Sequence, residues 1–580
     1  MSARRIYHFG AYRLDAAERT LTRRGEPVPL TLKAFDTLLL LVERHGHTVR
    51  KEEILARVWP DSFVEEGVIS VNIFTLRKCL AEDGTEFIQT VPKQGYRFVA
   101  PVDEDDAASL LRQQRPATPS ASKAIAVLPF RWLNVDDADR YLGLGIADAL
   151  ITRLSNLTNL IVRPTSSVRK YEQDAADAVT IGQRLAVDAV LEGSIRRYGE
   201  RLRVSVQLVS VRAGAPAWAE MFDEPLADLF AVEDSISERV ADALTLKLTG
   251  EERSRLGHRH TRNAEAYSFY LKGRYFWNKR SEDGLSRGIE YFHKAIEMDS
   301  HYALAYAGLA DSYLLGAKRQ PPKEAMPRAR AAALRAIEID DRLGEAHTSL
   351  ARIQMSFDWD WPGAEKAFQR ALALNPNYAT AHQWYANYLV ATGRRREAIR
   401  EIKRALELDP LSISINSAVG WVHYMAREFD DAITAYERAL ELEPTFLMAQ
   451  REAAMVYAAK GDGAQAMAAV EMALAMSNGG WIEMGILAHT LAAAGRQQEA
   501  LDVLFRLEPA VSEEYVLPQI IAATYLQLAD KRKALGWLAA AYSHQSSSLM
   551  WLKADPWFDD LRREPEFLAL LQRIGLASSQ

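Results

Sequence analysis

The side chains best suited to chemistry lie in two neighbouring stretches, a helix expected over about residues 65–80 and a hairpin expected over residues 87–99. Asparagine can pair with adenine through two hydrogen bonds, and lysine or arginine can pair with guanine or phosphate. Valine, threonine and phenylalanine can contact the methyl group of thymine. The candidate DNA-contacting residues are Val68, Asn72, Phe74, Thr75, Arg77, Lys78, Thr90, Lys93 and Arg97.

We find no catalytic constellation beside these residues. The sequence has no G-x-S-x-G, P-loop or H-E-x-x-H motif. Its single cysteine, Cys79, cannot form a disulfide within the chain or a C-x-x-C zinc site. His258 and His260 lack a cysteine or carboxylate cluster, so a solvated linker is the better interpretation of this pair. We therefore expect no enzyme activity, no metal and no cofactor.

Short elements must position the candidate residues. The sequence predicts strands at residues 7–9, 12–14, 20–23 and 27–30, a helix capped by Thr31, a short second helix, and then the third helix over about 65–80. The core face of the third helix is Ile69, Ile73, Leu76 and Leu80, spaced by four, three and four residues. We place Asn72, Phe74, Thr75 and Lys78 on the opposite face, with Arg77 on its flank.

Residues 3–101 resemble the OmpR/PhoB-type winged helix without a large gap. The matching segments are Leu30-Thr31, Val58-Trp59-Pro60, Val71-Asn72-Ile73 and Gly95-Tyr96-Arg97-Phe98. The resemblance implies DNA binding, with the third helix in the major groove and the hairpin as a wing. Residues 1–100 hold 15 basic and 13 acidic side chains, so attraction to phosphates is modest. A winged helix used only for protein contacts stays open, because fold alone does not fix function.

The C-terminal half repeats with a period of 34 residues. Ala364, Ala398, Ala432, Ala466, Ala500 and Ala534 keep this spacing, and Pro376, Pro410 and Pro444 close successive units. A 34-residue unit with small residues at fixed places is a helix–turn–helix repeat, and this one resembles the tetratricopeptide repeat (TPR). We expect about eight repeats over residues 264–546 and capping helices over residues 547–580.

The TPR resemblance also implies a concave groove. In that family, positions three before and one after the small residues of the first helix face the groove. Here they are Gln383, Asn387, Ser417, Trp421, Arg451, Met455, His489 and Gln519. Such a lining suits a protein or peptide partner, with RNA polymerase as one candidate. Packing between repeats is an equally open interpretation of Trp421 and Met455.

The region between these parts alternates between strands and helices. Residues 124–130 form an apolar run, and residues 202–209 alternate between apolar and polar. Segments 126–130, 191–194 and 217–220 resemble the TolB amino-terminal-like α/β domain, which implies a fold over residues 124–250 and almost nothing about activity. Acidic, proline and serine residues over 102–123 predict a flexible linker.

The 580-residue chain is thus predicted to be multidomain, with an N-terminal α+β winged helix at residues 1–101, a middle α/β domain and a C-terminal all-α TPR superhelix. The net charge of −6 excludes a strongly basic coat protein but not one small DNA-binding domain. A single cysteine, no apolar leader and no run of 18 apolar residues favour the cytoplasm, without a membrane partner.

These features predict a bacterial one-component transcriptional regulator, similar to HilA-like regulators, whose winged helix binds double-stranded promoter DNA and whose TPR region binds a partner or signal. Because the winged helix starts at residue 3, with no receiver domain before it, we expect regulation without phosphorylation of this chain. The alternative is an adaptor or scaffold, in which the TPR array is the working part and the winged helix serves protein docking.

Overall fold

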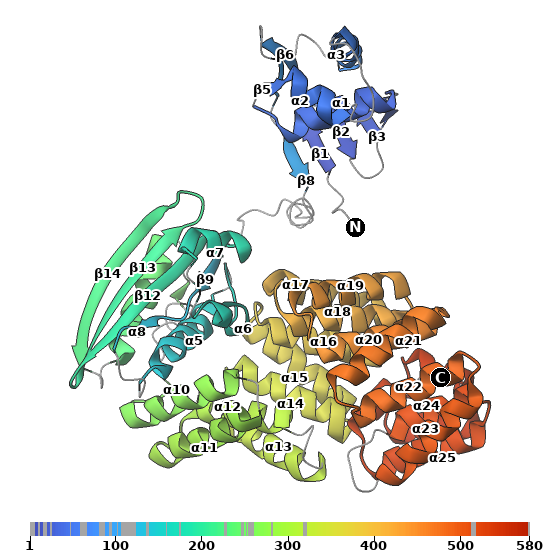
Figure 1. Cartoon of the computed structure of the whole chain (residues 1–580). Coiled ribbons are helices and arrows are strands. Elements are labelled where there is room, and N and C mark those ends of the chain that lie inside the picture. The colour runs from blue at the N-terminus through green and yellow to red at the C-terminus, as the bar shows by residue number, and fades with distance from the viewer. Residues whose placement is uncertain are drawn as a thin grey trace. The chain divides into compact units, whose positions relative to one another are not determined.

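The computed structural model describes residues 6–9, 12–15, 20–23, 26–28, 30–46, 48–58, 67–80, 87–91, 95–100, 102–105, 123–134, 139–157, 159–172, 174, 176–225, 229–244, 249–250, 252, 260–279, 282–316, 322–511 and 518–577. The chain divides into two compact units, Met1–Ala121 and Ser122–Gln580 (Figure 1).

The first unit is a winged helix, in which two antiparallel sheets frame three helices. One sheet has the order β4-β3-β2-β1-β8 and the other β5-β7-β6. The elements are β1 (Ile6–Phe9), β2 (Tyr12–Asp15), β3 (Thr20–Arg23), β4 (Glu26–Pro27), α1 (Leu32–Glu43), β5 (Thr48–Arg50), α2 (Lys51–Val58), α3 (Gly67–Cys79), β6 (Ile88–Val91), β7 (Gly95–Phe98) and β8 (Asp103–Asp105). The predicted core face of α3 is confirmed, because all four of its residues are buried. Thr31 caps α1 by accepting a hydrogen bond from the Ala34 amide at 3.3 Å.

Strand β8 lies where the sequence predicted the start of a flexible linker. Its residues 103–105 pair antiparallel with β1, so that Asp103 lies opposite His8 and Asp105 opposite Ile6. Backbone pairing at a sheet edge needs no apolar side chain, and the acidic composition therefore gave no sign of this strand. Residues 106–122 of the expected linker lie outside the described residues.

The second unit begins with a mixed sheet packed against helices (Figure 1). Its order is β11-β9-β12-β13-β14; β9 is parallel to β11 and β12, β10 is parallel to β12, and β12, β13 and β14 are antiparallel. The alternating apolar residues of β13 are buried, which confirms the predicted one-faced hairpin. The elements are β9 (Lys123–Val127), β10 (Arg131–Trp132), α5 (Tyr141–Ser155), β11 (Leu160–Val162), α6 (Thr165–Val168), η1 (Arg169–Tyr171), α7 (Ala178–Arg184), β12 (Ala189–Tyr198), β13 (Arg201–Ser210), β14 (Ala215–Pro225) and α8 (Leu229–Ala243).

Eight successive helix pairs follow in the described part of the chain. They are α10 (Ala264–Asn278) with α11 (Glu282–Met298), α12 (Ala303–Gly316) with α13 (Pro322–Ile339), α14 (Gly344–Ile353) with α15 (Trp361–Leu374), α16 (Ala379–Ala391) with α17 (Arg395–Leu408), α18 (Ile413–Ala426) with α19 (Phe429–Leu442), α20 (Leu447–Lys460) with α21 (Gly463–Met476), α22 (Trp481–Ala493) with α23 (Gln497–Ala510), and α24 (Pro518–Gln527) with α25 (Lys531–Ser543). The six alanines with a 34-residue spacing are completely buried. Gly420 shows why these positions are small, because a Cβ atom there would lie 2.6 Å from the Tyr436 ring.

The array ends in three short helices, which we call the tail (residues 547–577). They are η4 (Ser547–Trp551), η5 (Pro556–Leu561) and α26 (Pro565–Arg573). The sequence predicted capping helices here, as a cover for the last repeat. The structure differs, because the tail also reaches back to earlier repeats: the Trp361 indole donates to the Ile574 carbonyl oxygen at 2.7 Å. Trp359 and Tyr542 of α25 also stack, with ring centres 5.4 Å apart.

A buried ion pair joins the middle domain to the first repeat. Asp148 on α5 accepts hydrogen bonds from the Arg274 guanidinium of α10 at 2.6 and 3.1 Å and from the Thr165 hydroxyl at 2.5 Å. Burial would raise the pKa of Asp148, but the Arg274 charge and these hydrogen bonds outweigh it and lower that pKa.

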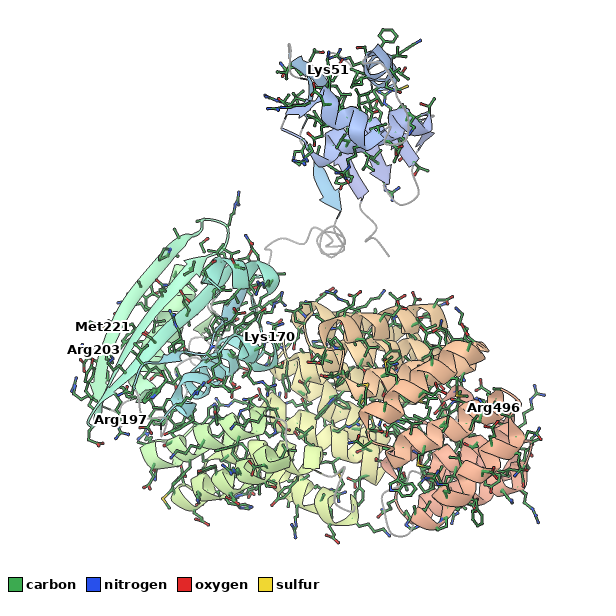
Figure 2. The ribbon with its side chains drawn as sticks, viewed as in Figure 1. Lys51, Lys170, Arg197, Arg203, Met221 and Arg496 are labelled. Carbon is green, nitrogen blue, oxygen red and sulfur yellow. The ribbon has the colours of Figure 1, made fainter. Side chains whose placement is uncertain are left out.

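We expect Asp148→Asn to destabilise the second unit by about 3–5 kcal/mol, because it leaves the Arg274 charge buried without a partner. Thermal and urea unfolding of the full chain measure the loss. Adding Arg274→Met should recover much of it, since both buried charges are then gone. The control is Glu499→Gln, which breaks an exposed pair with Arg496 (labelled in Figure 2) and should leave unfolding unchanged. Equal effects of Asp148→Asn and the control would contradict the argument.

Candidate DNA-binding face and partner groove

Helix α3 turns one face away from the core of the first unit. Val71 and Phe74 are 65% and 70% exposed on this face, and Lys78 is exposed as well. At 100° per residue, these three positions lie opposite the buried stripe that contains Ile73. The helix therefore presents a mostly apolar surface with one cation.

The structure corrects the predicted place of Asn72. Its side chain is half-buried, and Nδ2 donates to the Val68 carbonyl oxygen at 3.2 Å. Val68 itself packs against the core. Three residues after Ile69, Asn72 lies about 300° around the helix, beside the core stripe and not opposite it. Val71 holds the exposed position; we left it out of the prediction, although the same periodicity would have found it.

Arg77 joins α3 to the hairpin. Its Nε and Nη2 donate to the Ile88 carbonyl oxygen at 3.0 and 2.7 Å, and Nη2 also donates to the Thr90 hydroxyl at 2.8 Å. The guanidinium is thus used within the protein, where it holds the third helix against strand β6. Arg77 is therefore a positioning residue for the surface formed by α3 and the hairpin.

The other predicted contacts are divided between the two elements. The Thr75 hydroxyl donates to the Val71 carbonyl oxygen at 2.9 Å. Arg97 donates to the Thr48 hydroxyl at 2.8 and 3.2 Å, which ties β7 to β5. Thr90 is exposed on the hairpin. Lys93 lies outside the described residues.

We expect Arg77→Ala to loosen the hairpin, because hydrogen bonds from a charged group to Ile88 and Thr90 are lost. A loss of about 1–2 kcal/mol corresponds to roughly 5- to 30-fold faster local opening. Hydrogen exchange of the β6 amides measures this change in the full chain. Lys78→Ala, one residue further along the same helix, removes a charge and should leave the exchange rates unchanged. Identical exchange in both variants would show that Arg77 does not hold the hairpin.

The residues predicted to line the TPR groove lie on the first helices of their pairs, α16, α18, α20, α22 and α24. Several of them have partners within the array. Gln383 donates to the Ser414 carbonyl oxygen at 3.2 Å, and Arg451 pairs with the buried Glu483 at 3.2 Å. Met455 is buried, and the Ser417 hydroxyl donates to Glu452 at 3.0 Å.

The tail contacts two of the predicted groove residues, Trp421 and His489. Trp551 meets Trp421 edge-on, with ring centres 5.4 Å apart. Trp557 lies against His489, with ring centres 4.3 Å apart. We did not predict this contact, because the tail has no repeat partner that would reveal where it packs.

Four of the predicted groove residues carry a buried polar atom without a hydrogen-bond partner among the described residues. These atoms are Asn387 Oδ1, Trp421 Nε1, His489 Nδ1 and Gln519 Oε1. Such atoms are uncommon in folded proteins, and each costs on the order of 1–3 kcal/mol. These four predicted groove residues therefore each keep one hydrogen-bonding atom unused among the described residues.

Burial also controls protonation at this surface. It lowers the pKa of His489 to about 4, so the imidazole is neutral at pH 7. It raises the pKa of the Asp555 carboxyl to about 6, although hydrogen bonds from the Trp557 amide and the Tyr424 hydroxyl and the charges of Arg427 and Arg562 lower it. An ionised Asp555 is therefore costly at neutral pH.

We expect Asp555→Asn to stabilise the second unit at pH 7 by on the order of 2–3 kcal/mol, because the amide keeps an acceptor and cannot ionise. The folded-state pKa of about 6 lies above the ordinary 3.8. The carboxyl's contribution to stability is thus complete below pH 3.8 and is lost as the pH rises through 6. Urea unfolding at several pH values measures the difference between variant and wild type. It should grow from pH 4 to 6 and then stay constant; a difference independent of pH would contradict this reasoning.

Two further clusters lie elsewhere in the second unit. A hollow of about 450 Å³ on the middle-domain sheet is lined by residues of β10, β12, β13 and β14, and Figure 2 labels Met221 and Arg203 on this sheet. His423, Glu428 and Asp431 bring possible metal-ligating atoms within 4.8 Å of one another. The sequence analysis singled out neither cluster, because His-x4-Glu-x2-Asp is too unspecific a pattern to be noticed without the turn that folds it.

Three regions of the chain match known families. Residues 25–98 match the family described as transcriptional regulatory protein, C terminal. Residues 121–239 match the second domain of HilA/YgeH-like transcriptional regulators, and residues 360–421 and 418–480 match tetratricopeptide repeats. The chain thus combines an OmpR/PhoB-type winged helix, a HilA-like second domain and a TPR array. The TolB resemblance of the middle domain stays a prediction.

Similar proteins cover different shares of this chain. It is 24% identical over 422 residues to the transcriptional regulator HilA of Salmonella typhimurium, which is 71% of this chain and 72% of that protein. It is 34% identical over 197 residues to the Rhizobium meliloti protein named "Putative adenylate cyclase 3", of which it spans 33%. The solved DNA-binding domain of E. coli CadC is 28% identical, with a TM-score of 0.17, and matches 18% of this chain and 98% of that one. Among the described residues, no helix has the length and apolar character needed to cross a bilayer.

Proposed function

We propose that this chain is a one-component transcriptional regulator. Its winged helix binds promoter DNA through α3 and the β6–β7 hairpin, and its TPR region binds a protein or peptide partner that conveys a signal. The observation that carries the proposal is the exposed face of α3, which Arg77 holds against the hairpin, in a domain that matches a family of transcriptional regulators. A helix buried on one side and exposed on the other fits the roughly 12 Å major groove.

The chemistry of this face favours sites rich in A·T pairs. Val71 and Phe74 suit the methyl group of thymine, and Lys78 suits phosphate or guanine. The Thr90 hydroxyl on the hairpin suits a phosphate. Few cations are available, so specificity comes more from apolar contact than from charge.

Protein docking by the winged helix is the second candidate, and one observation favours it. Two large apolar side chains, Val71 and Phe74, are exposed on one helix face, as is common where proteins meet. The nearly balanced charge of residues 1–100 also gives little attraction to phosphates. The selection experiment below separates docking from DNA binding.

The remaining parts of the proposal follow from DNA binding. We place the chain where bacterial chromosomal DNA is, in the cytoplasm. We propose no catalytic role, and neither a cofactor nor a metal is needed for the function. The similarity to HilA over 71% of the chain supports a regulator more than an enzyme.

We expect the full chain to select a consensus from a pool of random duplexes. Phe74→Ala should reduce discrimination at one or two positions by about 1–3 kcal/mol, because an apolar contact with a base edge is lost. Lys78→Ala should weaken binding to all sequences similarly and lower the salt slope by about 1. Gel shifts at several salt concentrations measure both effects.

Lys460→Ala is the matched control, because it removes one exposed lysine from the TPR array, where it pairs with Asp430. It should leave affinity, specificity and salt slope unchanged. If the full chain selects no consensus even at low salt, the winged helix does not read DNA sequence, and protein docking is the better account.

A further inference from the structure

We infer that the concave groove of the TPR array is a peptide site whose occupant here is the chain's own tail, and that a partner segment must displace the tail to bind. This rests on the proposed partner role of the array and names the class of ligand. The competing segment carries two aromatic side chains followed by an acidic residue, as Trp551, Trp557 and Asp559 do in the tail.

Two tryptophans anchor the tail. Trp551 packs against Trp421 on α18 at an interplanar angle of 74°, and Trp557 packs against His489 on α22 at 38°. Both Trp557 and His489 are buried. Aromatic side chains buried in pockets carry most of the binding energy in many protein interfaces, and these two occupy positions two repeats apart.

Arg427 and Tyr424 contact tail residues close to the two tryptophans, namely Ala554, Asp555 and Asp559. Arg427 donates to the Ala554 carbonyl oxygen at 2.8 Å and to the Asp559 carboxylate at 2.5 and 3.3 Å. The Tyr424 hydroxyl donates to Asp555 at 3.3 Å. Arg427 thus recognises a backbone carbonyl and the Asp559 carboxylate together, and this is why we assign the groove to aromatic segments followed by an acidic residue. Arg427 also has a left-handed φ of 68°, which costs energy for a residue other than glycine.

The tail fits the groove only in part. Asn387 Oδ1, Trp421 Nε1, His489 Nδ1 and Gln519 Oε1 belong to predicted groove residues and are unpaired among the described residues, as is Trp557 Nε1 of the tail. A permanent core element would be expected to satisfy such atoms. A partner segment whose polar groups reach them gains hydrogen bonds that the tail does not make, so it can replace the tail.

The place of the tail in the chain allows this exchange. It follows α25 through residues 544–546, beyond the last helix pair, so no paired helix has to unwind when the tail leaves, and what its release costs is the burial of the apolar core that the tail shares with the array. While the tail is bound, only the open fraction of molecules accepts a partner, and the apparent affinity falls by that fraction. The tail therefore sets the concentration of partner that is needed for binding.

The test uses the full chain and a labelled synthetic peptide of residues 546–563. Anisotropy titrations compare the wild type with the double variant Trp551→Ala/Trp557→Ala, in which the resident tail is weakened. We expect the double variant to bind the peptide at least about tenfold more tightly than the wild type. Phe505→Ala is the control, because Phe505 is 80% exposed on α23, and it should behave as the wild type does.

Adding Arg427→Ala to the double variant should remove the gain, since Arg427 is part of the site. A double variant that keeps its helical content and cooperative unfolding but gains no peptide affinity overturns the inference. If the double variant does not fold, hydrogen exchange of the wild type decides: tail amides must exchange faster than those of α18 and α22. Exchange of the tail only by global unfolding overturns the inference. Gel shifts of the same proteins test DNA binding separately, so failure of one proposal is distinguishable from failure of the other.

Discussion

The second unit depends on covering the apolar inner surface of its helical array. Repeats that stack with small residues inside expose large side chains on their first helices, and here these include Trp421, Tyr424 and Met455. Water is a poor solvent for such a surface, so something must cover it. The tail does so: Leu549, Phe558 and other apolar tail residues share one core cluster with helices from α15 to α25. The tail of the same chain thus covers the apolar inner surface of the array.

Buried hydrogen bonds also join the middle domain to the helical array. The guanidinium of Arg163 donates to the carbonyl oxygens of Glu407 and Leu408 at the end of α17, and the Asn377 amide donates to those of Leu157 and Leu160. Together with the Asp148–Arg274 pair, these bonds join the sheet to the first and fourth repeats. Such buried polar links are costly to break singly. The middle domain and the array therefore pack as one compact unit.

Local and periodic features could be predicted from the sequence, but contacts between distant segments could not. The 34-residue period identified the alanines that are completely buried. The spacing of Ile69, Ile73, Leu76 and Leu80 identified the core face of α3. Trp551 and Trp421 are 130 residues apart, and no repeat relates them. Nor does periodicity show that Arg77 bonds to the hairpin, because that bond depends on tertiary approach. The sequence could thus predict which helix or strand carries a residue, while the residue's hydrogen-bond partners became known only from the structure.

The small net charge of the winged helix affects how tightly this domain would bind DNA and how that binding is controlled. With 15 basic and 13 acidic residues over positions 1–100, phosphate neutralisation supplies little non-specific binding. On the proposed DNA-binding face, one exposed lysine and two exposed apolar side chains would then give specificity at modest affinity. Occupancy of a promoter at physiological salt would need a second source of binding energy. A partner that is held by the array and itself contacts DNA would supply it, because tethering raises the effective concentration of that second contact. A tail that must first leave the groove makes this contribution conditional on the partner's concentration.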